Sequence, residues 1–117
     1  MTIEAILIKW LNENVAGYTA SGDIPEVRPK KFIVVERTGG PVDSVRIERP
    51  EVTISFYNAD SAADAASTAV QTDIKLRAEL PLLPQISKIE RNSLVRLDDL
   101  VIKCPRYLAY YSLVHLL

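Results

Sequence analysis

The stretch from residue 58 to residue 80 constrains what this chain can fold into more than any other feature. Ser61 and Asp64 stand at the spacing of a helix capping box, and Pro81 and Pro84 follow the stretch. Its small and apolar residues are Ala62, Ala63, Ala65, Ala66, Ala69, Val70 and Ile74. The pattern predicts a helix of about 20 residues, roughly 30 Å long, whose alanine face lets the backbone lie close to a sheet.

A second helix is expected over residues 2–15. Apolar residues recur there at spacings of three and four, which places them on one helical face: Ile3, Ile6, Leu7, Trp10 and Leu11. Thr2 can cap the first turn through its hydroxyl, and Gly17 suits the left-handed turn that ends a helix.

The remaining elements read as strands because they are rich in β-branched and aromatic residues. We expect a short β-prone piece at residues 18–20 and strands at 32–38, 45–48, 51–57, 86–97 and 106–117. The main elements then follow the order α-β-β-β-α-β-β. This order predicts one α+β domain over residues 1–117, in which a mostly antiparallel sheet packs against two helices.

The charge balance argues against two classes of partner. Fourteen basic and fifteen acidic residues give a net charge of −1, so no global field draws the chain to nucleic acid or to anionic lipid. Tyr107, Tyr110 and Tyr111 could stack bases on an open sheet, but adjacent strand residues point to opposite faces. Glu4 and Lys9 interrupt the first apolar segment, so we expect neither a signal peptide nor a membrane span, and synthesis in the cytoplasm.

Few residues suggest chemistry. The chain has one histidine, His115, and one cysteine, Cys104, and neither lies in a nucleophile signature or a zinc-ligand set. We therefore expect His115 to be structural or solvent-facing. The pair Asp98-Asp99 favours a turn over a metal or acid–base site. No enzyme activity, metal or cofactor is predicted.

The segment from residue 38 to residue 50 favours a surface loop. Thr38-Gly39-Gly40-Pro41 is glycine-rich but leads to an extended segment and not to a helix, which favours a tight turn over a phosphate loop. We expect exposed charges after it, at Asp43, Arg46, Glu48 and Arg49. Basic and acidic residues alternate through this region, a mixture that suits either a solvated face or a polar contact with a partner.

Three segments together resemble a known family. They are I-P-E-V-R-P-K-K-F-I-V-V-E-R-T-G-G, then R-P-E-V-T-I-S-F-Y, and finally P-R-Y-x-x-x-Y near the end of the chain. With the first helix and the alanine-rich helix, this order is similar to the tail terminator and tail-completion proteins of long-tailed bacteriophages. The resemblance spans almost the whole chain, and residues 29–40 and Arg49-Pro50 carry most of it.

The resemblance implies a structural role. Proteins of this family form a ring, usually a hexamer, that caps the finished tail tube, stops its polymerisation and joins the head connector. The expected partners are other copies of the chain, the tail tube protein and the head–tail connector protein. The expected location is the host cytoplasm during assembly and then the neck of the virion. The contact residues that we predict are Arg37, Thr38, Gly39, Gly40, Arg46 and Arg49.

Other functions stay open at this point. The chain could be another head–tail joining or minor tail protein, which shares the general architecture. It could also be a small non-viral α+β module that binds a peptide or nucleic acid. An enzyme is the third alternative, and it would require a perturbed carboxylate in a cleft.

Overall fold

The computed structural model describes residues 1–41 and 46–117. Helix α1 spans Ile3–Asn14, and its five buried residues are the apolar ones expected from the sequence. The amide of Ala5 donates to the Thr2 hydroxyl at 3.2 Å, which caps the first turn. Gly17 has a φ of +82° shortly after the helix ends, in the left-handed region that glycine reaches without strain. The predicted helix over residues 2–15 is confirmed.

The strands are β1 (Thr19–Ser21), β2 (Lys31–Gly39), β3 (Ile47–Glu48), β4 (Glu51–Asn58), β5 (Ile86–Arg96) and β6 (Arg106–Leu116). They form one sheet in which β1 pairs with β2, β2 with β4, and β4 with β6. Strand β1 runs parallel to β2, and every other pair is antiparallel. The α+β class and the mostly antiparallel sheet agree with the sequence.

Strands β3 and β5 lie on opposite sides of β6. His115 of β6 is in register with Glu48 of β3 and also with Ile86 of β5, and a strand residue has one neighbour on each side. Strand β3 therefore lies on the β4 side of β6, and Pro50 stands between β3 and β4. The strand predicted at 45–48 is present at its last two residues, whereas Val45 lies outside the described part of the chain.

The long helix α2 spans Ala62–Glu79 and is followed by a short 3-10 turn, η1 (Leu80–Leu82). Its buried residues are Ala65, Ala69, Thr72, Asp73 and Leu76, so the alanine contact with the sheet is confirmed. Val70 and Ile74 lie on the outer side of the helix, where they are 44% and 61% exposed. At about 100° per residue, Ile74 points roughly opposite to Ala65.

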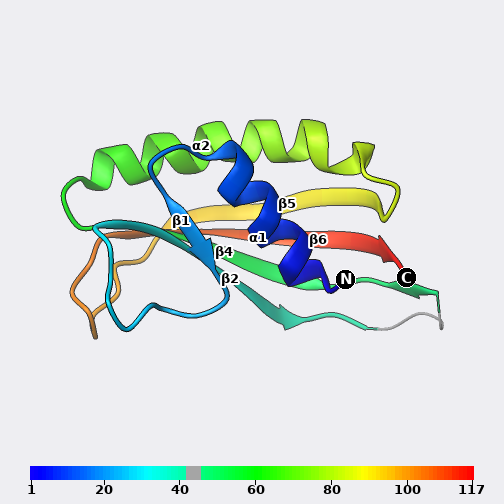
Figure 1. Cartoon of the computed structure of the whole chain (residues 1–117), viewed down its shortest axis with the longest axis horizontal. Coiled ribbons are helices and arrows are strands. Elements are labelled where there is room, and N and C mark those ends of the chain that lie inside the picture. Colours follow the sequence, from blue (N-terminus) through cyan, green and yellow to red (C-terminus); the bar gives the residue numbers. More distant parts are fainter. Residues whose placement is uncertain (42–45) are drawn as a thin grey trace.

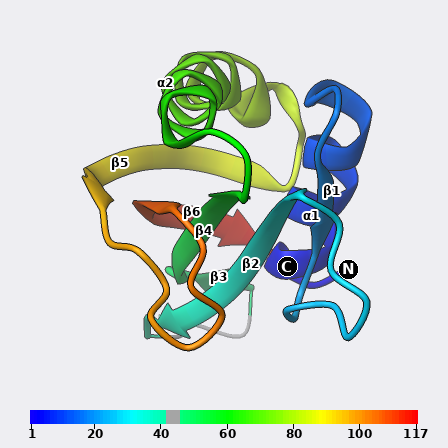
Figure 2. The same ribbon diagram turned by 90° about the vertical axis from the view of Figure 1, so that its left-hand side faces the viewer.

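Both helices cover the same face of the sheet. One core cluster contains side chains of α1 and α2 together with Ile33, Ile54 and Ala109 of the three central strands. Figure 2 shows α2 on one side of the sheet and the connection between β5 and β6 on the other. There a smaller cluster forms around Phe32 and Tyr57, whose rings stack with centroids 4.4 Å apart.

Candidate functional site

The predicted contact residues gather where β2 turns toward β3. Arg37 folds back over this turn, because its Nε donates to the carbonyl of Gly39 at 3.2 Å and its Nη2 to that of Gly40 at 3.3 Å. Its Nη1 binds Glu48 Oε2 at 2.9 Å. The guanidinium is therefore used within the subunit, where it fixes the path of the turn.

The other carboxylate oxygen of Glu48 lies 2.8 Å from Nδ1 of His115. Both residues are buried, with 8% exposure for Glu48 and 2% for His115. Hydrogen bonds from His115 and from Arg37 hold the pKa of the Glu48 carboxyl below its usual value. The prediction that Glu48 is exposed is wrong, because the ladder between β3 and β6 turns its side chain toward His115.

Gly40 allows two backbone segments to approach each other closely. Its φ is +103°, and a Cβ atom there would overlap the carbonyl oxygen of Arg49. The amide of Arg49 donates to the carbonyl of Pro41 at 3.0 Å, and the Thr38 hydroxyl donates to the carbonyl of Glu51 at 3.3 Å. These two hydrogen bonds hold Thr38 and Pro41 beside Glu51 and Arg49.

Arg46 and Arg49 are exposed beside this turn. Arg49 lines a shallow groove of about 270 Å³ whose other lining residues are Pro41, Glu51, Lys88, Glu90, Ser112, Leu113 and Val114. Lys88 and Glu90 form an ion pair at 2.8 Å across its wall. This groove carries both signs of charge at its surface, an arrangement that suits polar contact with another protein. We call the segment from Thr38 to Pro41 together with Arg46 and Arg49 the turn surface.

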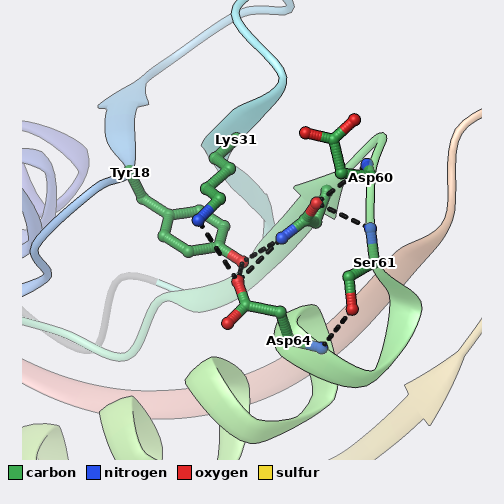
Figure 3. Close-up of polar contacts among 6 residues, drawn as sticks. Tyr18, Lys31, Asp60, Ser61 and Asp64 are labelled. Carbon is green, nitrogen blue, oxygen red and sulfur yellow. Dashed lines mark hydrogen bonds and ion pairs between the residues drawn. The ribbon is translucent and has the colours of Figure 1, made fainter.

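A second polar network fixes the start of α2 (Figure 3). Asn58 is fully buried and donates to Asp64 at 2.7 Å and to the Tyr18 hydroxyl at 3.1 Å, and this hydroxyl donates to Asp64 at 2.8 Å. The amides of Asp60 and Ser61 donate to the Asn58 side-chain oxygen, each at 2.9 Å. Burial raises the pKa of Tyr18. The network ties Tyr18, which precedes β1, to the end of β4 and the first turn of α2.

A third network surrounds Asp73, whose side chain is 1% exposed. It accepts hydrogen bonds from Arg77 at 2.8 and 3.1 Å, from Arg91 at 3.2 Å and from the Tyr111 hydroxyl at 2.8 Å. Burial and the neighbouring carboxylate raise the pKa of Tyr111. Asp73 is not predicted as a site from the sequence, although Asp73 and Arg77 have the i, i+4 spacing of a helical ion pair.

Asp99 and Cys104, which the sequence analysis weighed for chemistry, lie close together. Asp99 bridges to Cys104 at the turn between β5 and β6, as expected for a turn, and Cys104 is buried, which raises the pKa of its thiol. Residues 1–41 and 46–117 contain no group of three or more side chains that could hold a metal ion. Within the same residues, no helix is both long and apolar enough to cross a membrane.

No protein-family model matches the chain, and no curated protein matches it.

Proposed function

We propose that this protein is a structural assembly protein of a long-tailed bacteriophage, a tail terminator. It forms a ring of about six copies that caps the tail tube, stops its polymerisation and offers a surface to the head connector. It acts through protein contacts and not through catalysis. It assembles in the host cytoplasm and stays in the neck of the virion.

The positions of the resembling segments support this proposal. Residues 29–40 provide β2 and its turn, Arg49-Pro50 leads into β4, and the P-R-Y-x-x-x-Y segment lies at the start of β6. These strands are neighbours in the order β2-β4-β6. The resemblance thus covers the centre of one sheet and the turn that extends from it.

The observation that carries the proposal is the construction of the turn surface. Arg37 and His115 both bind the Glu48 carboxylate inside the subunit, and Arg46 and Arg49 are exposed beside this contact. A surface held in one conformation loses little entropy when it binds a partner. A surface of this construction suits a contact between proteins.

Native mass spectrometry of the purified chain tests the ring. We expect a species of about six times the 13.1 kDa of one chain, with a population that rises with concentration or on addition of tail tube protein. A strict monomer under all of these conditions would contradict the proposal. If the ring forms but binds only the connector and not the tube, the chain is another head–tail joining protein.

A further inference from the structure

We draw no further inference here: the strongest candidate, the cavity of about 430 Å³ between the start of α1 and the end of β6 (Figure 1), is lined by both acidic and basic residues, Arg37, Glu48 and His115 among them, and nothing in the structure shows what fills it.

Discussion

His115 and Glu48 are 67 positions apart in the chain, and their side chains meet at 2.8 Å between Nδ1 and Oε1 in the buried space beside β3. Arg37 binds the second oxygen of the same carboxylate. His115 lies in β6, Glu48 in β3 and Arg37 in β2. The contact therefore ties the turn surface to β3 and β6.

Glu48→Ala should destabilise the protein by about 1–3 kcal/mol, because it leaves Arg37 and the buried His115 without their carboxylate partner. Urea unfolding followed by circular dichroism measures this change. Glu36→Ala, at an exposed position of β2, is the matched control and should shift the free energy of unfolding by less than about 0.5 kcal/mol. Equal effects of the two substitutions would contradict the assigned role of Glu48.

The same contact predicts how stability depends on pH. The folded-state pKa of Glu48 lies below its ordinary value of 4.5, so the unfolded chain binds the proton more tightly. Its contribution is therefore complete above the unfolded pKa and is lost as the pH falls through the folded pKa. Unfolding free energies between about pH 3 and pH 6 should fall less steeply for Glu48→Gln than for the unchanged chain. Parallel curves would argue against this assignment.

Gly40→Ala should destabilise the protein far more than Gly17→Ala, although both glycines have positive φ. A methyl group at Gly40 meets the backbone of Arg49 and Pro50, whereas one at Gly17 meets nothing within 4 Å. We expect a loss of about 1 kcal/mol at Gly17 from the backbone conformation alone and at least ~2 kcal/mol at Gly40. Thermal unfolding of both variants provides the comparison, and similar losses would show that the turn is not packed as described.

Arg49→Glu should weaken docking to the tail tube by about threefold to tenfold at low ionic strength and by less at high ionic strength, if the tube presents an acidic surface. Lys75→Glu, an equal charge change on α2, is the control and should leave docking unchanged. Binding of both variants to the tail tube is measured at a low and at a high salt concentration. A loss that does not depend on salt would point to a steric contact at the turn surface.

The helices and most strands could be predicted because their signals are local. The Thr2 and Ser61 caps, the apolar spacing of α1 and the β-branched runs of β2 and β4 all lie within single elements. The outward position of Val70 and Ile74 does not follow from the sequence, because alanines occur on more than one side of α2 and do not define the buried face.

The buried polar networks could not be predicted, because their members come together only when the strands pair. Asp73 meets Arg91 eighteen positions away and Tyr111 thirty-eight positions away. Glu48 reads as an exposed loop residue until β3 is placed beside β6. The hydrogen bonds from Arg37 to the carbonyls of Gly39 and Gly40 likewise cannot be read from the sequence.

The length of tail tubes formed with and without this protein tests the central claim most directly. Tail tube protein of the same phage is allowed to polymerise alone, with the unchanged chain, and with the Arg46→Glu, Arg49→Glu double variant, and the tubes are measured by electron microscopy. We expect the unchanged chain to bind at one tube end and stop growth, whereas the variant, still folded by circular dichroism, lets tubes grow longer. Tubes of equal length in all three reactions, with no ring at their ends, would contradict this expectation.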